Sequence, residues 1–178
     1  MRDWVVAITA CWMAGAAAAY GAFPELRGRD PARRAALEQQ VGRMPEARPR
    51  LFCTEADLKA VRERIHHHAD LQEAYQWLLE WARSDHYYRN LWATPDQLIA
   101  ASVAYRLENR DERIGRHAAA IADFLVEAKG DRWTWPRIAK GLAIYYDWFY
   151  EDLDPQRRRK IGEAALHAAR QCYDTWRH

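Results

Sequence analysis

Apolar residues recur at helical spacing through almost all of the chain that follows Arg50. Runs of this kind predict amphipathic α-helices, and neither an alternating-polarity strand nor an Asn-Gly hairpin signal interrupts them. Thr54, Thr94 and Asp154 are typical helix-start residues, and proline follows the last two. The predicted helices cover about residues 55–67, 70–84, 97–107, 111–129, 135–152 and 155–173. The sequence therefore predicts an all-α fold.

The predicted helices differ in how much apolar surface they carry. Residues 97–107 are apolar around nearly the whole circumference, so this helix should be buried on several sides. Residues 111–129 carry one apolar stripe, and Gly130 is placed to end that helix. More uniformly apolar helices (97–107, 135–152) thus alternate with more charged ones (111–129, 155–173). Such alternation is expected where an inner ring of helices is wrapped by an outer ring, as in an α/α toroid or solenoid.

Two of these helices have a face that we expect to be buried. In the helix over 135–152, an apolar stripe is formed by Ile138, Leu142, Tyr145, Phe149 and Leu153. A polar stripe opposes it, formed by Lys140, Asp147 and Glu151. In the last helix, the predicted buried edge consists of Ile161, Ala165, Ala168 and Cys172.

Composition places the chain among globular proteins. Its 178 residues are 49% hydrophobic and 29% charged, which suits one domain with a real core. The formal net charge of +2 is too small to argue for nucleic-acid or membrane-surface binding. The one dense basic run, residues 157–160, is interpreted as a solvated helix face. We therefore expect no nucleic-acid partner.

The first residues differ from all that follow. Residues 1–21 combine an early charge with an almost uncharged, Ala-rich run, which indicates a secretory signal peptide and an exported, periplasmic or extracellular protein. The same run could instead stay uncleaved as an anchor, and only then is a membrane contact expected. Residues 22–50 read as a lead-in segment. Cys53 and Cys172 remain after cleavage, either as a disulfide or as two buried free thiols.

Two segments together resemble a known family. Residues 48–62 read RPRLFCTEADLKAVR, and residues 142–153 read LAIYYDWFYEDL. The first is similar to the opening HPRLFFT-x-x-x-L-x-x-L, and the second to the A-x-AYDWLYDDL signature, of the heparinase II/III-like polysaccharide lyases. The resemblance covers roughly residues 45–175. It departs from the pattern at Cys53, where an aromatic residue is usual, and at Tyr145, where a small residue is usual, and we interpret both as packing variation.

The resemblance implies a fold and an activity. It implies a secreted lyase with an N-terminal α/α toroid followed by an antiparallel β-sandwich, which cleaves uronic-acid-containing polysaccharides by β-elimination. Residues 51–178 would then be part of the toroid, an incomplete barrel whose partners are the missing C-terminal β-sandwich and an acidic polysaccharide, either a uronan or a glycosaminoglycan. Catalytic residues of the family come from later helices and the sandwich, so none is transferred here. No cofactor is expected.

Several side chains of this piece could line a polysaccharide cleft. Aromatic rings can stack on sugars, and a guanidinium group can pair with a carboxylate or sulfate in two-pronged fashion. The candidate substrate-binding residues are Trp92, Trp133, Trp135, Arg137, Tyr146 and Asp147. Each also has a structural interpretation: the tryptophans can plug helix ends, Tyr146 can be a core residue, and Asp147 can pair with a base of a neighbouring helix.

Other interpretations stay open or are set aside. The missing catalytic set leaves a non-catalytic helical module that binds carbohydrate or protein as the alternative. A hydrolase on a similar α/α barrel would need two facing carboxylates, and Asp147 has no obvious partner. His66, His67 and His68 diverge by about 100° per residue on a helix, so they cannot converge on one ion. No metal site is predicted.

Overall fold

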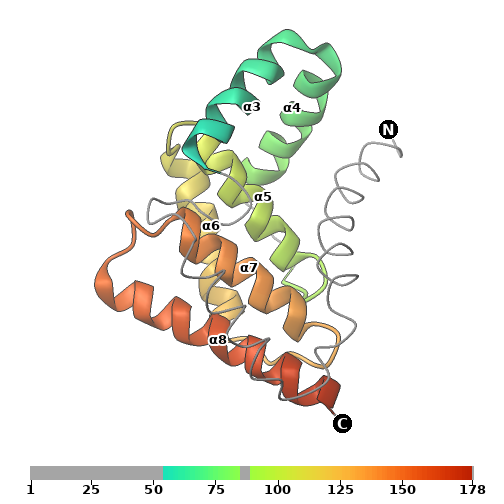
Figure 1. The fold of residues 1–178 in the computed structure, drawn as a ribbon, viewed down its shortest axis with the longest axis vertical. Coiled ribbons are helices and arrows are strands. Elements are labelled where there is room, and N and C mark those ends of the chain that lie inside the picture. The colour runs from blue at the N-terminus through green and yellow to red at the C-terminus, as the bar shows by residue number, and fades with distance from the viewer. Residues whose placement is uncertain (1–53, 85–88, 178) are drawn as a thin grey trace, which may run out of the picture. The chain divides into compact units, whose positions relative to one another are not determined.

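The computed structural model describes residues 54–84 and 89–177, and within them it contains six α-helices and no strand (Figure 1). The helices are α3 (Glu55–His67), α4 (Ala69–Arg83), α5 (Thr94–Leu107), α6 (Glu112–Val126), α7 (Trp135–Trp148) and α8 (Pro155–Arg177). All six belong to one compact unit, Pro45–His178. The all-α prediction is confirmed for these residues. The predicted signal peptide (1–21), the lead-in segment (22–50) and Cys53 lie outside the described residues.

Local hydrogen bonds start α3 and α8 where the sequence predicts. The Thr54 hydroxyl accepts a hydrogen bond from Asp57 N at 3.3 Å, and the Asp57 carboxylate accepts one from Thr54 N at 2.8 Å. This reciprocal capping box satisfies two of the backbone donors that a helix start leaves unpaired. At the start of α8, the Asp154 carboxylate accepts a hydrogen bond from Arg157 N at 2.9 Å. Both predicted caps are confirmed.

Four predicted helix boundaries are wrong, among them the end of α8, which reaches Arg177 rather than residue 173. Thr94 is the first residue of α5 rather than its cap, because the Asn90 side chain already accepts from Trp92 N and Ala93 N in the preceding turn. The helix α6 ends at Val126, before Gly130, which lies in the following loop. A Cβ atom on Gly130 would come within 2.8 Å of the Trp135 ring, so close packing explains this glycine. The helix α7 ends at Trp148, not Asp152, and a tight turn follows it.

Burial of α5 is nearly complete, as its apolar circumference predicts. Twelve of its 14 residues are buried, and α3, α4, α6 and α7 all pack against it. Its buried polar side chains have partners: the Ser102 hydroxyl donates to Leu98 O at 2.7 Å, and Arg106 donates to Glu55 at 2.7 Å. Bonds of this kind offset the cost of removing polar groups from water. The helix α5 is therefore the centre of the described unit.

The hairpins α5–α6 and α7–α8 stack against each other in register. Asp96 of α5 pairs with Arg137 of α7 at 2.9 Å, and Arg110, just after α5, pairs with Glu151, just after α7, at 2.7 Å. In each pair the second residue follows the first by 41 positions. Because equivalent positions meet at both ends, α5 and α7 run parallel as neighbours. Ion pairs between Asp123 and Arg157 and between Glu127 and Lys160 likewise join α6 to α8.

The hairpin α3–α4 differs from the other two. Few of its residues are buried, namely Leu58, Leu79 and Ala82. It contacts α5 through the N-terminal part of α3 and the C-terminal part of α4, where Arg62 donates to Arg106 O and Arg83 pairs with Glu108. In Figure 1 its other end projects away from α7 and α8. None of the described helices is both long enough and apolar enough to cross a bilayer.

The structure confirms the burial of some residues on the predicted stripes of α7 and α8 and contradicts the prediction for others. The apolar stripe of α7 is confirmed, since Ile138, Leu142, Tyr145, Phe149 and Leu153 are all buried. The polar stripe is wrong at Asp147, which is 1% exposed, because α5, α6 and α8 all cover α7. In α8, Ile161 and Ala168 are buried, whereas Ala165 and Cys172 are half-buried. Cys172 is a free cysteine.

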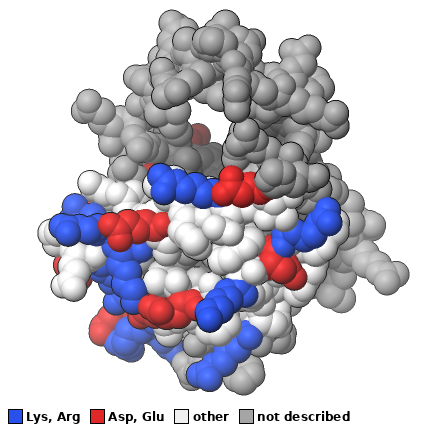
Figure 2. Space-filling view, turned by 90° about the horizontal axis from the view of Figure 1, so that it is seen from below, with Lys and Arg blue, Asp and Glu red and all other residues white. Residues whose placement is uncertain are grey.

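The basic run at the start of α8 is not simply a solvated face. Arg157 and Arg158 are half-buried, and Arg158 donates to Leu153 O at 2.7 Å and lies over the Tyr150 ring. Arg157 and Lys160 make the ion pairs to α6 given above, so the run joins neighbouring helices. On the described part of the face in Figure 2, basic and acidic side chains lie beside one another, consistent with the small net charge.

The close approach of α7 to α5 makes Gly141 a sensitive position. A Cβ atom there would lie 3.1 Å from Pro95 O and 3.3 Å from Pro95 Cα, so Gly141→Ala must push the two helices apart. Overpacking of this kind costs about 1–3 kcal/mol, against about 1 kcal/mol gained in helix propensity. We expect a net loss of up to about 2 kcal/mol in the free energy of unfolding, measured in urea.

Gly162 in α8 is the matched control. There a Cβ atom would meet the Tyr146 ring at 3.4 Å, an ordinary contact. Gly162→Ala should therefore raise the free energy of unfolding by up to about 1 kcal/mol. Equal effects of the two substitutions would contradict the close packing of α5 on α7.

Candidate functional site

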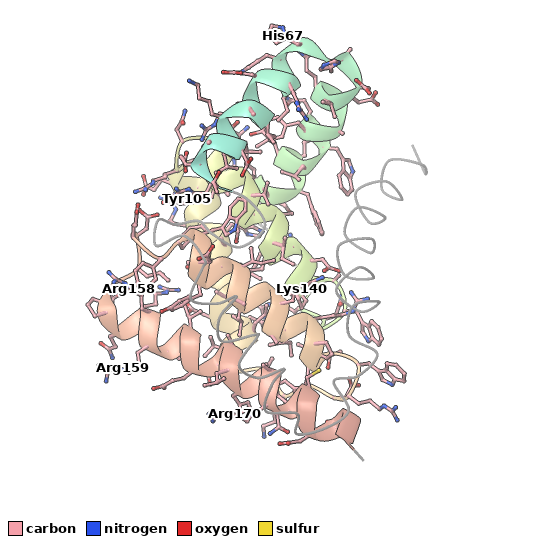
Figure 3. The ribbon with its side chains drawn as sticks, viewed as in Figure 1. His67, Tyr105, Lys140, Arg158, Arg159 and Arg170 are labelled. Atoms are coloured by element: carbon pink, nitrogen blue, oxygen red, sulfur yellow. The ribbon has the colours of Figure 1, made fainter. Side chains whose placement is uncertain are left out.

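An exposed tryptophan and a fixed arginine meet where α5 and α7 begin. The Trp92 side chain is 54% exposed, and the guanidinium carbon of Arg137 lies 5.0 Å from its ring centroid. Nη1 of Arg137 donates to Trp92 O at 3.0 Å and to Asp96 at 2.9 Å. Lys140, labelled in Figure 3, reaches from α7 to the same carboxylate at 3.1 Å. The hydrogen bonds hold the guanidinium against the ring, a cation–π arrangement.

A second exposed tryptophan lies in the turn before α7. Trp133 is 53% exposed, and the guanidinium carbon of Arg132 lies 4.8 Å from its ring centroid. Hydrogen bonds from the Thr134 side chain and from the Thr134 and Trp133 backbone hold the pKa of Asp131 below its usual value. The Asp131 charge is thus bound into the turn. We call the surface formed by six of these residues the tryptophan edge: Trp92, Asp96, Arg132, Trp133, Arg137 and Lys140.

The other three predicted substrate-binding residues make different contacts. Trp135 is half-buried, its ring meets the His167 ring of α8 edge-on at 5.5 Å, and it lines a cavity of about 290 Å³ between α6, α7 and α8. Tyr146 packs edge-on against Tyr150 at 5.5 Å. Asp147 is buried within α7. The structure thus brings Trp92 and Arg137 together and places these three residues in contacts between and within helices.

A second cavity, of about 360 Å³, lies where α5 and α7 end and α6 and α8 begin. We name it the motif pocket, because residues 142–153 supply much of its wall. Its lining includes Tyr105, Arg110, Tyr145, Phe149, Asp152 and Arg157. The Tyr105 ring, labelled in Figure 3, stacks on Phe149 at 4.1 Å between centroids. Sequence reasoning missed Tyr105 and Arg110, since the first reads as a core residue and the second as a loop residue.

The phenols of the motif pocket are neutral, and its arginines are paired with carboxylates. Burial raises the pKa of Tyr145 to about 12, and burial together with the Asp152 charge raises the pKa of Tyr105. Arg110 pairs with Glu151 and with Asp152, the latter at 2.9 Å, and Arg157 pairs with Asp123. Both phenols therefore hold their protons at neutral pH, so neither is an ionised base there.

The three consecutive histidines lie away from the tryptophan edge and from the motif pocket. His66, His67 and His68 are exposed, and Figure 3 labels His67 at the projecting end of the α3–α4 hairpin. In the part of the chain that the structure describes, no group of three or more metal-ligating side chains could hold an ion.

Comparison with known proteins does not assign the chain to a family. No family model, curated protein or solved structure matches it.

The raised pKa of Tyr145 predicts a loss of stability at alkaline pH. The folded state holds the phenol proton to about pH 12, whereas an unfolded tyrosine loses it near pH 10. The contribution is therefore fully present below about pH 10 and is lost as the pH rises through about 12. We expect the free energy of unfolding to fall less over this window in Tyr145→Phe than in the wild type. Identical pH dependence in urea melts of the two would contradict the burial of this phenol.

Proposed function

We propose that this chain is the toroid portion of a secreted polysaccharide lyase of the heparinase II/III-like kind. In this proposal the tryptophan edge binds the uronic-acid-containing polysaccharide that the enzyme cleaves by β-elimination. The in-register stacking of α5–α6 on α7–α8 supports the proposal, because toroids and solenoids are built from helix pairs that each contact their neighbours. Export and a C-terminal β-sandwich partner belong to the same proposal and rest on the resemblance of residues 48–62 and 142–153.

The observation that carries the proposal is the exposed Trp92 ring beneath the Arg137 guanidinium. A half-exposed tryptophan offers a flat apolar face on which a sugar ring can stack. Within the described residues, both hydrogen bonds of Arg137 come from Nη1, so its other N–H groups are placed to donate to a carboxylate. Because the guanidinium is already held in place, a ligand need not order it on binding. This combination suits an acidic sugar.

A non-catalytic carbohydrate-binding module is the alternative, and the motif pocket agrees with it as well as with the lyase, whose catalytic residues come from later helices and the sandwich. Proton abstraction beside a uronate carboxylate needs a base, and both pocket phenols have pKa values raised above the ordinary tyrosine value. The arginines Arg110 and Arg157 are paired with carboxylates of the chain itself. These groups are better suited to binding a ligand through hydrogen bonds than to removing a proton from it.

Calorimetric titration of the chain with heparan sulfate and alginate tests the binding. We expect binding that weakens as salt is added, because the contacts are partly ionic and exposed. Trp92→Ala should weaken it at least about tenfold, or by at least about 1.4 kcal/mol. The control is Trp77→Ala, which removes a 60% exposed tryptophan from α4 and should change nothing. Equal affinities for the two variants would contradict the assignment of the tryptophan edge.

Cleavage by the complete gene product distinguishes the two candidate functions, because the proposed lyase takes its catalytic residues from later helices and the β-sandwich. β-Elimination leaves unsaturated sugar ends that absorb ultraviolet light, so rising absorbance with the complete gene product supports the lyase. Binding by the chain with no such absorbance from the complete gene product favours the non-catalytic module. A chain that binds none of the uronans contradicts both.

A further inference from the structure

We infer that the tryptophan edge holds two subsites, one at the start of each stacked hairpin, and that its ligand is an acidic sugar chain long enough to span both. This inference rests on the proposed function and deepens it. Each subsite consists of one exposed tryptophan and one arginine over its ring: Trp92 with Arg137, and Trp133 with Arg132.

The turns that carry the two tryptophans are repeats of one sequence. The first reads Asn90-Leu-Trp92-Ala-Thr-Pro95, and the second reads Asp131-Arg-Trp133-Thr-Trp-Pro136. The Asn or Asp, the tryptophan and the proline all recur with an offset of 41 residues. The ion pairs between α5 and α7 join residues with the same offset, so the repeat in sequence is also the repeat in space.

The two turns also share their hydrogen bonds and backbone. The Asn90 side chain accepts from Trp92 N and Ala93 N at 3.1 and 2.8 Å, and the Asp131 side chain accepts from Trp133 N and Thr134 N, both at 2.9 Å. Ala93 has φ −99° and ψ −34°, and Thr134 has φ −95° and ψ −27°. Both turns therefore present the tryptophan in the same local geometry.

The hydrogen bonds that close the two turns do not involve the tryptophan rings. Hydrogen bonds to the Asn or Asp side chain hold each turn, and the tryptophan contributes only its backbone N–H to them. Both tryptophan residues are more than half exposed, 54% for Trp92 and 53% for Trp133. One exposed apolar residue on a surface is unremarkable, but two at repeated positions, each with a cation over the ring, form a patterned surface.

The two subsites lie side by side. Asp96 and Arg137 are the equivalent residues that follow Pro95 and Pro136, and they contact each other at 2.9 Å. Packed helices lie about 8–10 Å apart, so the two helix starts are separated by a distance of that order. A single sugar therefore contacts one subsite, and a chain of sugars reaches both.

The charges of the tryptophan edge favour an acidic chain over a neutral one. Arg132, Arg137 and Lys140 are the cations, and the Asp96 carboxylate is shared by two of them. The Asp131 carboxylate accepts hydrogen bonds from Trp133 N, Thr134 N and the Thr134 hydroxyl, which orient it within the turn, and together with Asp96 it leaves the three cations an excess of one positive charge. Carboxylates along a uronan can thus pair with the arginines while its sugar rings stack on the tryptophans.

The experiment measures the affinity of the full chain for alginate oligosaccharides of increasing length. When a ligand spans two linked subsites, the second contact forms within the complex, so affinity should rise on the order of 10²-fold once the oligosaccharide is long enough. Trp92→Ala and Trp133→Ala should each abolish this rise, and Trp133→Phe should restore part of it. Trp77→Ala, the control, should keep the whole rise.

Each outcome decides the inference. Loss of the length dependence in both single variants, with their thermal unfolding unchanged, supports two subsites. A rise that persists in Trp133→Ala, or wild-type affinity that does not depend on length, overturns the inference and leaves the proposed function standing. Absence of wild-type binding at every length overturns both.

Discussion

The burial of α5 is the constraint on which the rest of the described structure depends. Its neighbours α3, α4, α6 and α7 can all approach because small residues, among them Ala100, Ala101 and Ala104, lie along it and are buried. Gly141 allows α7 to come close to Pro95. The helix α7 in turn carries α8, its most extensive partner. The position of the tryptophan edge therefore follows from how α7 packs on α5.

Apolar packing stabilises the contact of α5 with α7, whereas the ion pairs determine which residues of the two helices face each other. An exposed ion pair contributes about 0–1 kcal/mol, so Asp96–Arg137 and Arg110–Glu151 add little to stability by themselves. They lie at opposite ends of the α5–α7 contact, however, and a slide of α7 by one turn would break both at once. Apolar side chains alone would tolerate such a slide more easily. The pairs thus specify which residues of the two hairpins become neighbours.

Sequence reasoning succeeded where structure depends on local interactions. The caps at Thr54 and Asp154 bond to backbone groups three residues away, so their effect is visible in a short window. It failed where burial depends on several neighbours. Asp147 reads as a solvent-facing residue of an amphipathic helix, and it is buried because α7 is covered on more than one side. Gly130 reads as a helix end, and it serves a contact with Trp135 instead.

The candidate site was predictable in part for the same reason. Aromatic and basic residues near helix starts identified Trp92, Trp133 and Arg137, but residue type cannot separate them from Trp135. Two residues after Trp133, the Trp135 ring meets His167 of α8 and is half-buried, while Trp133 is exposed. The repeated turn was the signal that could have separated them. The Asn or Asp side chain sets the turn, and the tryptophan two residues later is the one left in water.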